Sequence, residues 1–269
     1  MSVSALFVKF IFFSFLGWVW ESIYCTVKEK RWADRGFLFG PVCPIYGFCV
    51  VTVIIFSKLL PCVFDPSEPV YIQFLICMFG SAVVEYVTSW GLEKRFSARW
   101  WDYSDMPLNI NGRVCLPASV SFGVAGVLII RYLIPAISGI EGHISREIYE
   151  VFSIVFAAIL GADIALTEAS LSTLLKTIEE YKSEFNLKAE ETYSTISKMP
   201  QNMEKVLTEK REVIIENTED HMQKMVKYAE RMSTAQKHIL KNMILFVPRT
   251  GKESIVKLNQ LRDYIKRMK

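Results

Sequence analysis

The hydrophobic pattern divides the chain into an apolar part, residues 1–170, and a charged part, residues 171–269. The apolar part contains segments of about 20 residues with few charges, the length that a helix needs to cross a bilayer. There are five such segments: Ser4–Val27, Pro41–Pro61, Val70–Leu92, Cys115–Pro135 and Ile148–Thr167. The pattern therefore predicts an all-α, polytopic membrane domain with about five transmembrane helices, the fifth at about 148–170, followed by a helical tail.

Two of these segments carry related sequences, Gly17–Arg31 and Ser81–Arg95. Each has a glutamate inside an apolar run, Glu21 or Glu85, with small residues four positions away on either side and Glu-Lys-Arg at its end. The same alignment matches Arg35 to Arg99. These matches predict an internal repeat with units at about 4–62 and 70–137.

The charged tail has a helical pattern. A first helix is expected to end near Met199, because Pro200 disfavours helix at the residue before it. A second is expected from about Asn202 to Phe246. It carries a narrow apolar seam of coiled-coil type, Met225, Tyr228, Met232, Ala235, Ile239, Met243 and Phe246. The tail either packs against its own domain or serves as a self-association or partner-docking module.

The last part of the tail is basic. After Pro248 and Gly251, the pattern predicts a short amphipathic helix over 252–269 that would lie on anionic lipid. Nucleic acid is not an expected partner.

Lysines and arginines predict the orientation. The loops at 28–40 and 93–114 hold four basic residues each, whereas the loop at 62–69 holds none. Basic loops face the cytoplasm. We therefore expect a multi-pass protein of the cell membrane with its N-terminus outside and its tail in the cytoplasm. The net charge of +3 is small, so the orientation is inferred from where the basic residues lie and not from their total number.

Several function classes are disfavoured. The six cysteines show no metal-ligand or disulfide spacing, and the three histidines lie outside the predicted spans, so we expect no metal, no cofactor and no enzymatic activity. The closest approach to a nucleotide-binding motif, Thr250-Gly-Lys-Glu253, lacks the first glycine and the hydroxyl after lysine. The chain therefore has no ATPase of its own by that route.

Acidic residues inside apolar helices are the main candidates for a functional site, because a carboxylate in hydrocarbon is costly. Glu21, Glu85 and Asp163 are all expected near the cytoplasmic side. The small residues beside both glutamates predict a shared interface around a pseudo-twofold axis. Two interpretations remain open: a cation-, proton- or substrate-binding site, or structural neutralisation by Arg35 and Arg99.

The loop between the third and fourth spans adds aromatic and acidic candidates, Trp101, Asp102 and Tyr103. Trp and Tyr prefer the membrane interface, so this segment is either an anchor or a lid over the acidic residues. In the second span, Pro44 and Gly47 are expected to loosen the start of the helix.

These segments carry a family resemblance. Phe15–Trp18 with Glu21, Arg35–Pro41, Cys43–Gly47 and Arg99–Ser104 resemble the prokaryotic membrane family described as putative ABC-transporter type IV, or CmpB-like, over about residues 6–170. Leu116–Ser119 departs from the more aromatic segment of that family, which puts the pocket shape there in question.

The resemblance implies a membrane component of a transporter, permease-like, with the lipid bilayer, a separate ATPase subunit and a second copy of the chain as partners. The alternative is a non-transporting scaffold or regulator whose tail recruits a partner. An enzyme acting on lipid headgroups is a third and weaker alternative.

Overall fold

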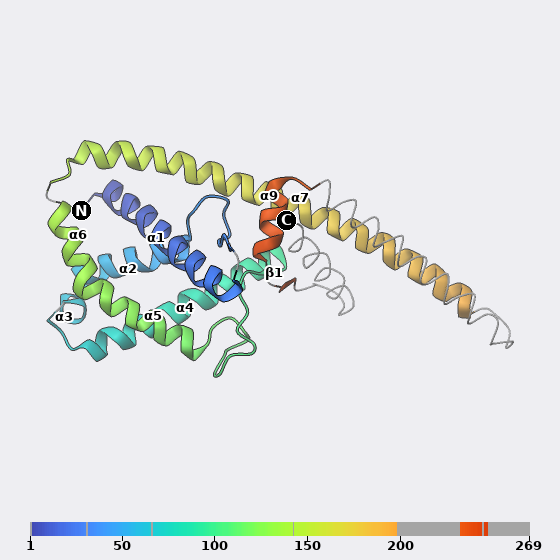
Figure 1. Cartoon of the computed structure of the whole chain (residues 1–269), viewed down its shortest axis with the longest axis horizontal. Helices are drawn as coiled ribbons and strands as arrows, with labels where there is room; N and C mark the ends of the chain where they lie inside the picture. Colours follow the sequence, from blue (N-terminus) through green and yellow to red (C-terminus); the bar gives the residue numbers. More distant parts are fainter. Residues whose placement is uncertain are drawn as a thin grey trace. The chain divides into compact units, whose positions relative to one another are not determined.

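The computed structural model describes residues 2–30, 32–65, 67–141, 143–197, 232–243 and 245–246. The described chain is mostly helical, which confirms the predicted all-α class (Figure 1). Its helices are α1 (Val3–Glu29), α2 (Pro44–Leu59), α3 (Pro61–Phe64), α4 (Val70–Phe96), α5 (Leu116–Leu128), the π-helical turn η1 (Ile129–Leu133), α6 (Ile134–Glu141), α7 (Arg146–Ser197) and α9 (Thr234–Asn242). Two short strands, β1 (Ala98–Arg99) and β2 (Leu245–Phe246), complete the described elements.

Four described helical segments are long and apolar enough to cross a membrane: Val3–Glu29, Val70–Phe96, Leu116–Gly139 and Arg146–Leu174. They correspond to four of the five predicted spans. The remaining span, predicted at 41–61, is the 16-residue helix α2. At 1.5 Å per residue α2 is about 24 Å long, shorter than a hydrocarbon core of about 30 Å. It is short because Pro44 begins it and the chain leaves the helix at Leu60, before Pro61.

The membrane helices pack as two hairpins, α1 with α2 and α4 with α5. Glycines let the helices approach closely. Gly47 lies against the Phe10 carbonyl and the Ser14 side chain, and a Cβ atom at Gly126 would lie 2.5 Å from Cys77 Sγ. Gly47 therefore stands inside a regular helix and permits packing, which corrects the expectation that it loosens the start of α2.

The hairpin packing also corrects the predicted interface between the two glutamate-bearing helices. Gly17, expected to face the corresponding stripe of α4, is covered by the Tyr46 side chain of α2. The main contacts of α1 are with α2, and those of α4 are with α5. The small residue beside Glu21 thus serves packing within the hairpin.

A polar cluster ties the loop before α4 to the helices. Arg131, on the π-helical turn η1, donates hydrogen bonds to Gln73 Oε1 at 3.1 Å and to the Glu68 carbonyl. Gln73 is fully buried and donates to the Asp65 carbonyl at 2.6 Å. The π turn adds a residue per turn relative to the flanking helix, and it carries the arginine that binds this loop.

Helix α7 is continuous over 52 residues, so the predicted fifth span and the first predicted tail helix form one element. The chain divides into two compact units, Met1–Thr167 with Asn242–Val247, and Glu168–Lys241 with Pro248–Lys269.

The second predicted tail helix is wrong at its C-terminal end. Its described part is helical only over Thr234–Asn242, and the chain then forms strand β2, which pairs antiparallel with β1. Ala98 stands opposite Phe246, and Arg99 opposite Leu245. Backbone pairing with a distant loop therefore overrides the helical pattern. Residues 198–231 and the predicted basic helix at 252–269 lie outside the described residues, as do Met225 and Tyr228 of the seam.

Candidate functional site

Glu85 lies in the middle of α4, and its side chain is only 5% exposed. The Tyr103 hydroxyl, from the loop between β1 and α5, donates a hydrogen bond to Glu85 Oε1 at 3.0 Å. Glu85 Oε2 is buried without a hydrogen-bond partner. Burial of a carboxylate with a single neutral donor costs free energy. The Glu85 carboxyl is therefore suited either to be protonated or to bind a cation.

Glu21 has a similar partner. The Tyr46 hydroxyl, from the first turn of α2, donates a hydrogen bond to Glu21 Oε1. Glu21 is half-buried, whereas Glu85 is buried. Both glutamates are thus held by a tyrosine from a neighbouring segment.

The two carboxyls act on a common neighbour, Tyr103. Burial raises the pKa of the Tyr103 phenol, and the nearby Glu85 and, more weakly, Glu21 carboxyls raise it further. Tyr103 therefore remains a protonated hydrogen-bond donor throughout the physiological range, and Glu21 and Glu85 belong to one electrostatic cluster.

Arg35 and Arg99 do not neutralise Glu21 and Glu85 in the structure. Arg35 Nη2 lies 3.0 Å from Glu29 Oε1, and Arg99 Nε lies 2.5 Å from Glu93 Oε2. The two acidic partners occupy corresponding positions in the predicted repeat. Both arginines therefore pair with acids near the helix ends, and the intramembrane glutamates bind tyrosine hydroxyls instead.

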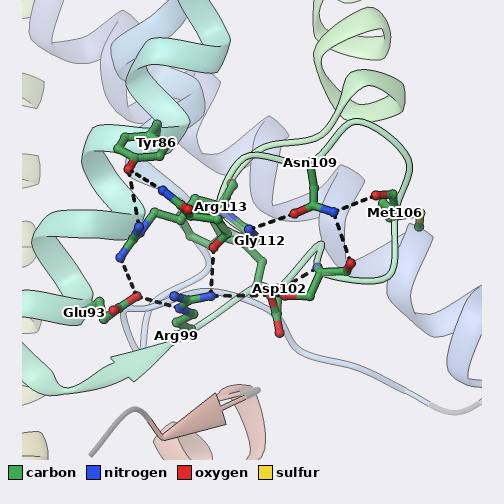
Figure 2. Close-up of polar contacts among 11 residues, drawn as sticks. Tyr86, Glu93, Arg99, Asp102, Met106, Asn109, Gly112 and Arg113 are labelled. Atoms are coloured by element: carbon green, nitrogen blue, oxygen red, sulfur yellow. Dashed lines mark hydrogen bonds and ion pairs between the residues drawn. The ribbon is translucent and has the colours of Figure 1, made fainter. Parts of the chain in front are cut away.

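The loop that carries Tyr103 is held by a polar network around Glu93 (Figure 2). Arg113 Nη2 lies 2.9 Å from the same Glu93 oxygen that binds Arg99. Arg99 also donates to the Asn111 carbonyl at 3.1 Å and lies 3.5 Å from Asp102. Two arginines and two acids thus connect the end of α4 to both ends of the loop.

The turn within this loop depends on Asn109 and Gly112 (Figure 2). The Asn109 side chain donates to the Ser104 and Met106 carbonyls and accepts from the Gly112 N–H. Gly112 has φ of +68°, and a Cβ there would lie 2.5 Å from Ser104 Oγ. The turn therefore requires glycine at this position.

The two tryptophans of the loop have separate roles. Trp101 Nε1 donates to the Arg113 carbonyl at 3.0 Å. Trp100 is buried against Phe37 and Phe96, with ring centroids 5.0 and 6.2 Å away. Trp101 thus joins the two ends of the loop, and Trp100 packs the start of the loop against Phe37 and Phe96.

Asp163 of α7 has hydrogen-bond partners other than those of Glu21 and Glu85. Its carboxylate accepts hydrogen bonds from the backbone N–H groups of Phe39 and Gly40, each at 2.9 Å, and from Thr167 Oγ1 at 3.3 Å. It binds the loop before α2, and no hydrogen bond or ion pair joins it to Glu21 or Glu85 within the described part of the chain.

Among the predicted site residues, the structure thus brings together Glu21, Glu85 and Tyr103, with Arg35, Arg99, Trp101 and Asp102 supporting the surrounding loops.

Sequence reasoning missed Tyr46 and Glu93. Tyr46 is contained in the Cys43–Gly47 motif, but nothing local indicates that its hydroxyl reaches Glu21. Glu93 belongs to the repeated Glu-Lys-Arg motif, and its distance of six residues from Arg99 recurs between Glu29 and Arg35. This repeated spacing was the sequence signal from which the two ion pairs could have been predicted. The described residues contain no group of three or more His, Cys, Asp or Glu side chains suited to a metal ion.

The comparison with known families gives one match. The family model described as putative ABC-transporter type IV matches residues 8–168, which confirms the resemblance seen in the motifs. The match begins within α1 and ends within α7, so it covers most of both hairpins and of the candidate membrane span Arg146–Leu174. No curated protein and no solved structure matches the chain significantly.

Proposed function

We propose a transport role on one premise: the chain belongs to the putative ABC-transporter type IV family. In this proposal the protein is a permease-like membrane component, without catalytic activity of its own, and a separate ATPase subunit supplies energy where the transport is ATP-driven. Glu21 and Glu85 form its site for a transported cation or proton. The chain lies in the cell membrane with its basic loops and tail in the cytoplasm.

The observation that carries this proposal is the Glu85 carboxyl. It is buried in a membrane-crossing helix, with one oxygen bound by Tyr103 and the other without a partner. The arginines that would neutralise a purely structural acid are paired with Glu29 and Glu93 instead. An intramembrane acid without a protein counter-ion is typical of ion and proton pathways.

The loop carrying Tyr103 supports the same interpretation. Its network with Glu93, Arg99 and Arg113 holds the phenol on Glu85, so the loop closes one side of the acidic cluster. Movement of this loop would remove the donor from Glu85 and open the cluster, as a gate requires.

The experiment is uptake into liposomes that contain the full chain. Tracer influx of monovalent cations and internal pH are followed for the wild type, Glu21→Gln and Glu85→Gln. We expect each substitution to reduce uptake to the level of empty liposomes, because each removes a negative charge of the site. Glu150→Gln is the matched control, since Glu150 forms an exposed ion pair with Arg146.

Retention of uptake in both glutamate variants would overturn the proposed site. Absence of uptake in the wild type, with and without ATPase-containing membranes, together with stable binding of a soluble partner by the full chain, would support the scaffold alternative.

A further inference from the structure

The two glutamates of the acidic cluster differ in their surroundings. Glu85 is 5% exposed and its Oε2 has no hydrogen-bond partner, whereas Glu21 is half-buried. Each accepts a hydrogen bond from a tyrosine, Tyr103 for Glu85 and Tyr46 for Glu21. The same side-chain chemistry is therefore placed in a drier environment on α4 and a wetter one on α1.

The groups that face Glu85 come from every neighbouring segment. Tyr103 belongs to the loop, and Cys115 precedes α5 and acts on Tyr103. Glu21 on α1 and Cys49 on α2 are close enough to interact electrostatically with Glu85. None of these groups carries a positive charge, and in the described part of the chain Glu85 forms no ion pair with lysine or arginine.

A neutral carboxylic acid fits this environment better than a carboxylate, because it places no uncompensated charge there. Its carbonyl oxygen accepts from Tyr103, and its own O–H occupies the oxygen that lacks a donor. Burial of an uncompensated carboxylate is costly, and protonation avoids this cost. A divalent cation is a poorer fit, because calcium takes about six to eight oxygen ligands, whereas Oε1 of each carboxyl and both phenols are already used in hydrogen bonds to one another.

We propose that Glu85 binds one exchangeable proton on Oε2, and that this proton is the ion that the site formed by Glu21 and Glu85 transports. The inference rests on the proposed transport function and names its substrate class. When the O–H bond of Glu85 breaks, the proton passes to Glu21 or to water, and Glu85 becomes a carboxylate with Tyr103 as its donor. Two carboxyls whose environments differ in this way divide the roles of proton holder and proton acceptor.

The first part of the test measures protonation directly. Infrared spectra of the purified full chain at neutral pH, in water and in deuterium oxide, report the carbonyl stretch of protonated carboxyls. We expect a deuterium-sensitive band in the wild type that is absent in Glu85→Gln and retained in Glu21→Gln and Glu150→Gln. A band that persists unchanged in Glu85→Gln, or that never appears in the wild type, overturns the inference.

A variant that keeps a carboxyl at position 85 makes the test decisive even if Glu85→Gln does not fold. Glu85→Asp shortens the side chain and retains the carboxyl, so the band should remain at a shifted frequency. If Glu85→Gln does not yield folded protein, the shift in Glu85→Asp decides the assignment. An unshifted band would contradict it.

The second part separates this inference from the transport proposal. Proton flux into liposomes carrying an internal pH dye is compared with tracer cation flux. A Glu85-dependent band without any flux supports proton binding and contradicts the transport role. Cation uptake that depends on Glu85 in protein lacking the band supports transport and overturns the proton as its ion.

Discussion

The Arg99 guanidinium lies 2.5 Å from Glu93 Oε2, and Arg35 meets Glu29 in the corresponding place of the first hairpin. In both cases the acid is near the end of a membrane-crossing helix and the arginine follows six residues later. The same local contact thus ends the first helix of each hairpin. In the second hairpin the acid also binds Arg113, which makes it the centre of the network that holds the loop.

Glu93→Gln is expected to destabilise the protein, because it leaves Arg99 and Arg113 without their shared carboxylate. Breaking a buried ion pair costs about 3–5 kcal/mol, and the partial exposure of these side chains places the loss near the lower limit. Melting of the detergent-solubilised protein measures the change. Glu29→Gln is the matched control, since Glu29 is more exposed and binds Arg35. An equal decrease in melting temperature for both variants would contradict the central role of Glu93.

Gly112→Ala is expected to disrupt the loop that carries Tyr103. Alanine disfavours φ of +68°, and its Cβ would lie 2.5 Å from Ser104 Oγ. We expect a loss of about 1–3 kcal/mol, together with faster proteolysis within the loop. Gly80→Ala is the control, because a Cβ there would meet no atom within 4 Å beyond its chain neighbours and its own helix backbone, and alanine favours helix. The prediction fails if loop cleavage in Gly112→Ala matches that in Gly80→Ala.

Asp163→Ala is expected to release the backbone of the loop before α2. The change removes the acceptor of the Phe39 and Gly40 N–H groups. An unsatisfied buried donor costs about 1–3 kcal/mol, and these donors are partly buried, so the loss should lie near the lower limit. Hydrogen exchange at these two amides, read by mass spectrometry of the covering peptide, should become faster. Glu150→Ala on the same helix loses only an exposed ion pair and should leave that peptide unchanged. Unaltered exchange in Asp163→Ala would show that other contacts hold this loop.

The orientation predicted from the basic loops is testable by cysteine labelling. In a variant with the native cysteines replaced, Ser67→Cys should react with an impermeant reagent added from outside, and Asp105→Cys only after the cytoplasmic side is opened. Both positions are exposed, so access depends on the side of the membrane. The reverse pattern of reactivity would invert the topology.

The fold class, the family and the four longest membrane helices were predictable from the sequence, because apolar segments of this length have few alternatives to a spanning helix. The intramembrane glutamates were recognisable for the same reason, since a carboxylate in an apolar run stands out against its surroundings. The repeated Glu-Lys-Arg motif also marked the positions where Glu29 and Glu93 form their ion pairs.

The partner of each acid was decided only by the tertiary structure. Neutralisation of Glu21 and Glu85 by Arg35 and Arg99 was one of two interpretations that the sequence left open. In the structure these arginines bind Glu29 and Glu93, while tyrosine hydroxyls bind the glutamates. Hairpin packing also decided that Gly17 faces Tyr46, and backbone pairing with β1 decided that the tail forms strand β2 after α9. These outcomes depend on contacts between segments far apart in the chain. Helical periodicity predicts which residues share a face of one helix, but it does not predict which distant residues they contact.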